Sequence, residues 1–128
     1  MSKYAFGKNV NLAFDQAVAA VTQALAKEGF GVLSDIDVAA TLKKKLGLDM
    51  PPYRILGACN PQFAHRALEA EPEIGTLLPC NVVLRQTGGK TVVDIMDPLA
   101  VMQLVGKPEV ARIATEVRGR LDRVLAAL

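Results

Sequence analysis

The sequence has few of the side chains on which nucleic-acid binding depends. It contains no tryptophan, two tyrosines and four phenylalanines in 128 residues. Proteins that bind single strands stack bases on aromatic rings, and few rings are present. The net charge is +2, from 15 basic and 13 acidic residues, whereas nucleic-acid-binding domains carry a clustered basic excess. We therefore expect no nucleic-acid partner.

Long apolar runs are also missing. No stretch of the sequence approaches the roughly 20 apolar residues that span a bilayer, and residues 1–6 do not resemble a signal peptide. We therefore expect no membrane partner and a cytoplasmic location. In that reducing compartment the two cysteines, Cys59 and Cys80, are expected to be free thiols.

The common catalytic and cofactor motifs are absent from the sequence. Neither serine, Ser2 or Ser34, lies in a Gly-x-Ser-x-Gly turn, and no Walker loop or dinucleotide fingerprint occurs. The cysteines do not form a Cys-x-x-Cys motif. The single histidine, His65, and the two cysteines match no zinc-ligand spacing, and a solvated helix position explains this histidine. We expect no metal and no cofactor.

The composition and length indicate one globular domain. The chain is 51% hydrophobic and 22% charged, which is the balance of a packed domain, and domains commonly have about 100–150 residues. No linker or low-complexity segment divides the chain, so residues 1–128 are assigned to a single domain.

Periodicity and turn residues predict the order of helices and strands. Asn11, Asn60 and Asp97 stand where side chains cap helix starts, and proline follows the last two directly. Gly88-Gly89 predicts a tight hairpin turn. The expected strands are 3–8, 30–36, 53–59, 80–86 and 91–96, and the expected helices are 12–28, 37–46, 61–71, a short one from 98, and one from 108 to the C-terminus.

This order favours an α+β fold. A hairpin between the last two strands makes the sheet at least partly antiparallel, and no strand is followed by the glycine-rich turn of a doubly wound fold. We expect a curved, mainly antiparallel sheet with helices packed on one face.

A repeated dipeptide singles out one candidate site. Cys59-Asn60 ends a predicted strand immediately before a helix, and Cys80-Asn81 begins the next strand. The two steps are predicted to meet at one end of the sheet. There the N-terminus of the helix could lower a thiol pKa or attract an anion. Packing alone, a ligand or anion site, and thiol chemistry remain open as explanations, because buried cysteines often act as small apolar residues.

The chain resembles a bacterial and archaeal family called domain of unknown function 302. The early Glu28-Gly29-Phe30-Gly31-Val32-Leu33 and the late Asp97-Pro98 fit its pattern. The most specific resemblance lies in Tyr53-Arg54-Ile55-Leu56-Gly57-Ala58-Cys59-Asn60-Pro61, Ala67-Leu68-Glu69-Ala70-Glu71-Pro72-Glu73-Ile74-Gly75 and Leu77-Leu78-Pro79-Cys80-Asn81-Val82-Val83.

The resemblance implies a fold like that of the TATA-box-binding protein and a homodimer, but no established activity and hence no catalytic residues. Fold alone does not imply DNA binding. Our leading hypothesis is a homodimeric module that binds a small ligand or a sulfur species near Cys59, Asn60, Cys80 and Asn81. The alternatives are a thiol-dependent redox or transfer enzyme using Cys59 or Cys80, and a scaffold that acts through its dimer surface.

Overall fold

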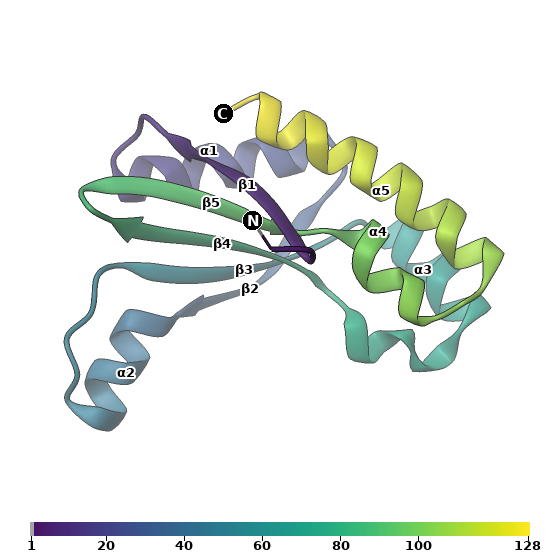
Figure 1. Cartoon of the computed structure of the whole chain (residues 1–128), viewed down its shortest axis with the longest axis horizontal. Helices are drawn as coiled ribbons and strands as arrows, with labels where there is room; N and C mark the ends of the chain where they lie inside the picture. The colour runs from purple at the N-terminus through teal and green to yellow at the C-terminus, as the bar shows by residue number, and fades with distance from the viewer. Residues whose placement is uncertain (1) are drawn as a thin grey trace.

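The computed structural model describes residues 2–128 and has an α+β architecture (Figure 1). Its strands are β1 (Ala5–Val10), β2 (Gly31–Asp37), β3 (Tyr53–Cys59), β4 (Cys80–Thr87) and β5 (Lys90–Met96). Its helices are α1 (Phe14–Lys27), α2 (Val38–Leu46), α3 (Pro61–Ala70), α4 (Pro98–Val101) and α5 (Pro108–Ala126). Two 3₁₀ helices, η1 (Pro72–Leu77) and η2 (Met102–Leu104), complete the chain.

The five strands form one open, entirely antiparallel sheet in the order β1-β5-β4-β3-β2. The expected α+β fold with an antiparallel sheet is therefore confirmed. The first and second strands lie at opposite edges, so α1 crosses the sheet between them (Figure 1). The β4–β5 hairpin turns through Gly88 and Gly89, which both have positive φ, as a tight turn of this kind requires.

The core lies between one face of the sheet and the helices α1 and α5. Side chains alternate between the two faces of a strand, and the alternate residues Cys80, Val82 and Leu84 of β4 are buried. Val21 and Leu25 of α1 and Leu121 of α5 have no exposed surface and belong to the same cluster. This packing covers one face of the sheet, whereas the other face is open.

Two of the three predicted helix caps are present. Asn60 Oδ1 accepts a hydrogen bond from the Phe63 backbone N–H at 3.5 Å, and Asp97 Oδ1 accepts one from Leu99 N–H at 2.9 Å. The predicted Asn11 cap is wrong: α1 begins at Phe14 and has no side-chain cap. The Thr91 hydroxyl donates to the Leu12 carbonyl oxygen at 2.9 Å, which ties the preceding segment to β5 and delays the helix.

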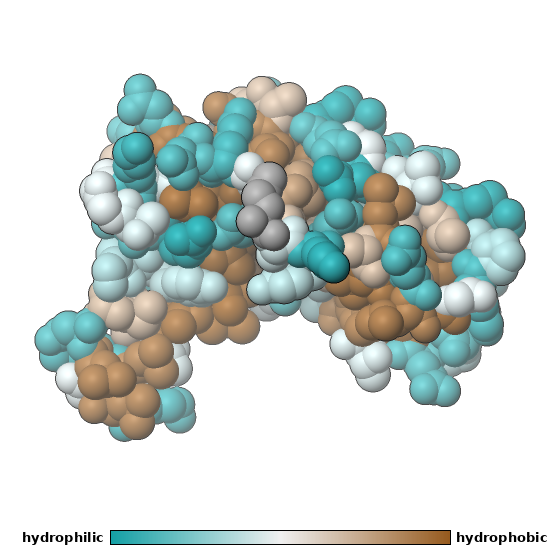
Figure 2. All heavy atoms as spheres, in the orientation of Figure 1, coloured by the Kyte–Doolittle hydropathy of each residue, from teal (hydrophilic) through white to brown (hydrophobic). Residues whose placement is uncertain are grey.

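The helix α2 departs from the expectation that helices pack on one face of the sheet. None of its nine residues is buried, and it projects beyond β2 and β3 (Figure 1). The face of this projection seen in Figure 2 carries an apolar patch bordered by hydrophilic side chains, and Leu46 and Leu48 at its end are 64% and 54% exposed. Asp37 caps α2 by accepting from Ala40 N–H, and Gly47 ends it with a left-handed conformation.

An arginine joins the C-terminal helix to the N-terminal strand. The Arg118 guanidinium lies 3.8 Å from the centre of the Phe6 ring and 2.7 Å from Asp97 Oδ2. The ring and the carboxylate therefore hold the start of β1 and the start of α4 against α5. Within the described part of the chain, no helix is both long and apolar enough to cross a membrane.

We predict that Leu121→Ala lowers the free energy of unfolding by about 2–5 kcal/mol, because it leaves a cavity between α5 and the sheet. Urea denaturation followed by circular dichroism measures this change. The matched control is Leu104→Ala, at a leucine that is 80% exposed, for which we expect a change within about 0.5 kcal/mol. Equal effects of the two substitutions would contradict this assignment of the core.

Candidate functional site

The junction between β3 and α3 shapes one end of the candidate site. The strand ends at Cys59, Asn60 caps the helix, and Pro61 takes the first helical position, where its missing N–H costs nothing. Asn60 is 9% exposed and packs beside Gly29, which has a φ of +86°. A Cβ on Gly29 would stand 2.9 Å from Asn60 Nδ2, so only glycine fits here without displacing the amide.

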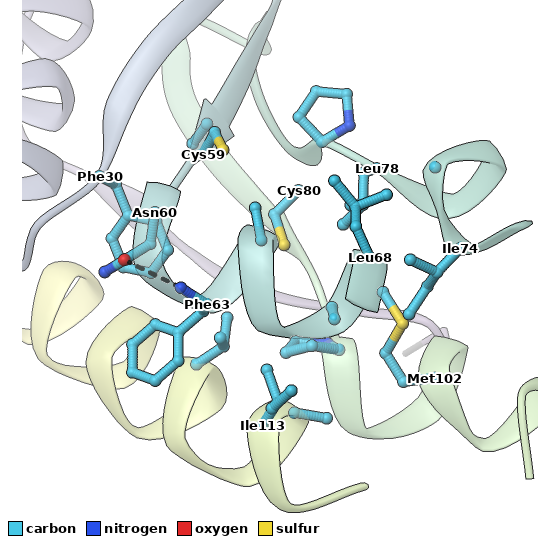
Figure 3. Close-up of a pocket in the computed structure, with 18 of the residues that line it drawn as sticks. Phe30, Cys59, Asn60, Phe63, Leu68, Ile74, Leu78, Cys80, Met102 and Ile113 are labelled. Carbon is cyan, nitrogen blue, oxygen red and sulfur yellow. Dashed lines mark hydrogen bonds between the residues drawn. The ribbon is translucent and has the colours of Figure 1, made fainter. Parts of the chain in front are cut away.

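Beside this junction lies an apolar cavity of about 310 Å³. It is partly open to solvent and is lined by the ends of β3 and β4 and by α3, η1, α4 and α5, which meet where the sheet ends (Figure 3). A volume near 300 Å³ is at the lower limit for small-molecule sites. The wall is formed mainly by Phe30, Leu33, Ala58, Phe63, Ala64, Ala67, Leu68, Ile74, Leu78, Met102, Val110, Ile113, Ala114 and Val117.

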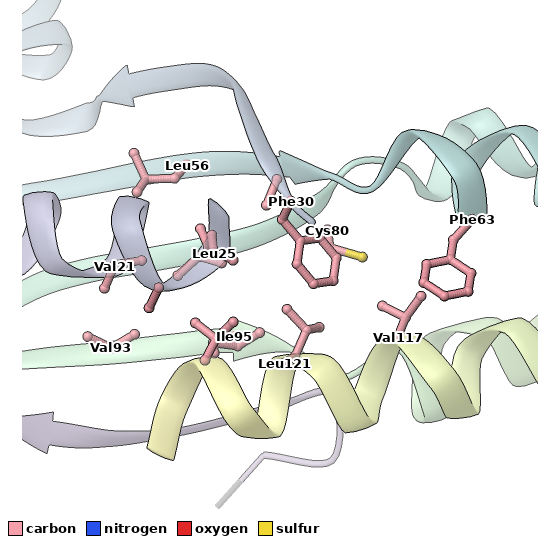
Figure 4. Close-up of a cluster of buried hydrophobic side chains, with 14 of the residues drawn as sticks. Val21, Leu25, Phe30, Leu56, Phe63, Cys80, Val93, Ile95, Val117 and Leu121 are labelled. Carbon is pink, nitrogen blue, oxygen red and sulfur yellow. The ribbon is translucent and has the colours of Figure 1, made fainter. Parts of the chain in front are cut away.

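Both cysteines line this cavity. Ala58 pairs with Cys80 across β3 and β4, so Cys59 and Cys80 come from neighbouring positions of adjacent strands. Figure 4 shows the Cys80 sulfur directed toward the space between Phe63 and Val117. Both cysteines are free thiols, with Cys80 buried and Cys59 half-buried.

Cys59, Asn60 and Cys80 all line the cavity, whereas Asn81 does not. Asn81 follows the buried Cys80 along β4, so its side chain lies on the other face of the sheet. It lines a shallow groove on that open face together with Tyr53, Val83 and Arg85. The prediction that Asn81 lies with the other three residues of the candidate site is therefore wrong.

The predicted lowering of a thiol pKa is also wrong. Burial raises the pKa of Cys59, and it raises the pKa of Cys80 to about 11, with the neighbouring Cys59 contributing to that increase. Cys80 is buried and Cys59 half-buried, and at both positions the cost of removing a charged thiolate from water exceeds any benefit from the helix N-terminus. At neutral pH both thiols are protonated and the cavity carries no thiolate.

Neither the histidine nor the acidic residues adds a chemical group to the cavity. The His65 side chain is 74% exposed, and its Nε2 lies 2.5 Å from Glu69 Oε1 one turn later on α3. Asp94 pairs with Arg85, at 2.8 Å, on the open face of the sheet. Among residues 2–128, no three His, Cys, Asp or Glu side chains form a cluster that could hold a metal ion.

Sequence reasoning did not identify the apolar residues that form most of the wall. Ile74 of η1 lies in a segment for which the sequence predicts no helix or strand, and Met102 of η2 follows directly on the short helix predicted from residue 98. The peptide bond between Leu78 and Pro79, beside η1, is cis. Apolar residues recur at steps of three and four along α5, but this period does not distinguish Ile113, at the cavity, from Leu121, in the closed core.

Comparison with known proteins identifies the family. The family model described as "Domain of unknown function DUF302" matches residues 6–128. The chain belongs to the DUF302 family. This assignment confirms the resemblance seen in the sequence, including its extent over nearly the whole chain.

A solved DUF302 structure is similar throughout its length. The crystal structure of an uncharacterized conserved DUF302 protein from Bacillus stearothermophilus superimposes with a TM-score of 0.91 at 31% sequence identity. The alignment covers 98% of each chain. No curated protein matches the sequence.

We predict that native Cys80 reacts slowly with iodoacetamide at pH 7–8 and that its rate rises about tenfold per pH unit up to pH 9.5, because only the thiolate reacts and the thiol pKa is about 11. Half-buried Cys59 should react faster than Cys80 throughout. Mass spectrometry of alkylated peptides measures both rates. A rate for either thiol that levels off below pH 7 would contradict the raised pKa values.

Proposed function

We propose that this DUF302 protein binds a small, predominantly apolar molecule in the cavity beside the β3–α3 junction. The observation that carries the proposal is the wall of the cavity, which consists almost entirely of hydrocarbon and sulfur apart from Asn60. Small-molecule sites commonly combine such a wall with a few fixed polar groups. Transfer of apolar ligand surface from water would supply the binding free energy.

The protonation state of the two cysteines favours reversible ligand binding over catalysis. The two thiols are protonated at neutral pH because burial raises their pKa values, and the histidine and acidic residues are directed elsewhere. A neutral thiol is polarizable and packs well against apolar or sulfur-containing ligands. We therefore assign Cys59 and Cys80 to the binding wall and keep the thiol-dependent enzyme as the alternative.

We also propose that the chain pairs with a second copy of itself through the projection formed by β2 and α2. Three features support this. The outer edge of β2 has no partner strand within residues 2–128, α2 buries none of its residues, and Ile36, Leu46 and Leu48 are exposed there. An unpaired strand edge beside apolar surface favours association. The cytoplasmic location and the absence of a nucleic-acid partner stay predictions.

Filling the cavity tests ligand binding. Ala64→Phe places a ring at the cavity wall, so we expect it to weaken the binding of 1-octanol at least tenfold. The measurement is a titration followed by the methyl NMR signals of the methionines, since Met102 lines the cavity and Met50 does not. Only the Met102 signal should shift.

The control for this experiment is Ala19→Phe, at an exposed position of α1, which should leave octanol binding unchanged. Failure of octanol to shift the Met102 signal of the unaltered protein would exclude this cavity as an apolar binding site. Equal octanol affinity in the Ala64→Phe variant would do the same.

Self-association is tested separately by sedimentation velocity. We expect the unaltered chain to sediment as a dimer and the double variant Leu46→Glu/Leu48→Glu to sediment as a monomer, because two charges would enter the apolar contact. The control is Leu104→Glu at the opposite end of the molecule, which should remain dimeric. A dimer that persists in the double variant would contradict the proposed surface.

A further inference from the structure

The cavity has a mouth with an apolar rim that no other element within residues 2–128 covers. Among the residues that line the cavity, the exposed ones are Leu33, Leu68 and Gly75. Leu33 is 71% exposed and Leu68 is 42% exposed. Leu33 stands at an irregularity of β2, where the register to β3 shifts between Val32 and Ser34. The mouth, defined by these three exposed residues, therefore opens beside β2.

The helix α2 lies too far from this mouth to cover it within one chain. The strand β2 begins at Gly31, opposite Cys59 of the cavity wall, and ends at Asp37, opposite Arg54. Its seven residues span roughly 20 Å at about 3.3 Å per residue, and α2 starts with the next residue, Val38. Figure 1 shows α2 and α3 beyond opposite ends of the sheet. The length of β2 thus separates the exposed surface of α2 from the mouth of the cavity.

A second copy placed beside β2 brings these two surfaces together. The outer edge of β2 has no partner strand within residues 2–128. Assemblies of two identical chains are usually two-fold symmetric, and a two-fold axis perpendicular to this edge makes the two β2 strands run in opposite directions. The partner's Asp37 then lies at the Gly31 end of this copy, so the partner's α2 lies at the cavity mouth. The symmetry repeats the same contact at the other end of the pair.

The charges of the two surfaces are complementary. The helix α2 contains three consecutive lysines, residues 43–45, and no acidic residue. The segment 69–74, which connects two residues of the mouth, contains three glutamates and no basic residue. Lys44, Lys45 and Glu73 have no ion-pair partner in the part of the chain that the structure describes. Opposite charges favour the encounter of two surfaces and fix their register, so α2 of one copy matches the mouth of another.

We infer that α2 of each copy covers the cavity mouth of its partner, so that one ligand site is built from two chains. The partner's Leu46 and Leu48 lie against Leu33 and Leu68, and its lysines face the glutamates of segment 69–74. This inference rests on the proposed function, because it joins the proposed ligand cavity to the proposed contact through β2 and α2. A ligand covered in this way loses its remaining contact with water, so ligand binding and pairing stabilise each other.

Reversal of the charges tests the contact. Lys44→Glu/Lys45→Glu and Glu69→Lys/Glu73→Lys each bring like charges together at both contacts, so we expect each variant alone to self-associate about tenfold more weakly than the unaltered chain. An equimolar mixture of the two variants should form a heterodimer of nearly unaltered affinity, since both contacts then join opposite charges. Sedimentation velocity over a range of concentrations measures the dissociation constants.

The matched control is Lys3→Glu/Lys8→Glu, which reverses two exposed charges near the other edge of the sheet. Lys8 belongs to β1, the strand at that edge, and Lys3 shortly precedes it. We expect this variant to self-associate like the unaltered chain. Normal self-association of Glu69→Lys/Glu73→Lys would show that α2 meets another surface, such as the partner's α2, and would overturn the inference. Failure of the mixture to restore pairing would also overturn it.

Octanol binding tests whether the covered mouth is part of the ligand site. At a protein concentration where the mixture is dimeric and each variant alone is monomeric, octanol should bind the mixture about tenfold more tightly than either variant. The Met102 methyl signal reports this binding, because Met102 lines the cavity. Octanol should also shift the unaltered chain toward the dimer.

The outcomes separate this inference from the proposed function. If octanol binds monomer and dimer equally, or if the charge-reversed variants pair like the unaltered chain, the shared site is excluded while the cavity and the pairing surface remain as proposed. If octanol shifts the Met102 signal of no sample, the proposed ligand cavity fails and the shared site fails with it. If the unaltered chain sediments as a monomer, the proposed pairing and the shared site fail, and the cavity is unaffected.

Discussion

The architecture depends on apolar packing of α1 and α5 against a single face of the sheet. This contact buries the alternate side chains of the central strands and leaves the opposite face open. The helix α5 is longer than the covered part of the sheet and continues to α3 and α4 (Figure 1). In that part of the molecule α5 packs against helices and no longer against strands. The cavity lies where the one kind of contact gives way to the other. The candidate site is thus a consequence of where the sheet ends beneath a long helix.

Much of the fold could be predicted because capping residues and turn residues, which act on their neighbours in the sequence, determine where its helices begin and where its hairpin turns. Asn60-Pro61 and Asp97-Pro98 form the expected helix starts, and the glycine pair forms the expected hairpin. The failures come from contacts between distant residues. The start of α1 depends on a hydrogen bond from Thr91 to Leu12, far apart in the sequence. The helix α2 is exposed because no other element within residues 2–128 packs over it. A local sequence pattern does not indicate whether another part of the chain will cover a helix.

The candidate site was only partly predictable. The approach of Cys59 and Cys80 follows from pairing of adjacent strands, and the separation of Asn81 from Cys80 follows from the two-residue period of a strand. Their pKa values could not be predicted, since the burial that raises them involves residues of helices distant in the sequence.

The position of β1 at the sheet edge affects how the chain assembles. Phe6 pairs with Ile95, and within residues 2–128 no other strand borders β1. During synthesis from the N-terminus, this first strand therefore has no place to dock until β5 has emerged. Contacts between residues so far apart in sequence slow folding, and an unpaired strand is open to association with other chains in the meantime. Closure of the β1–β5 edge is accordingly a late, long-range step, although β1 precedes the other strands along the chain.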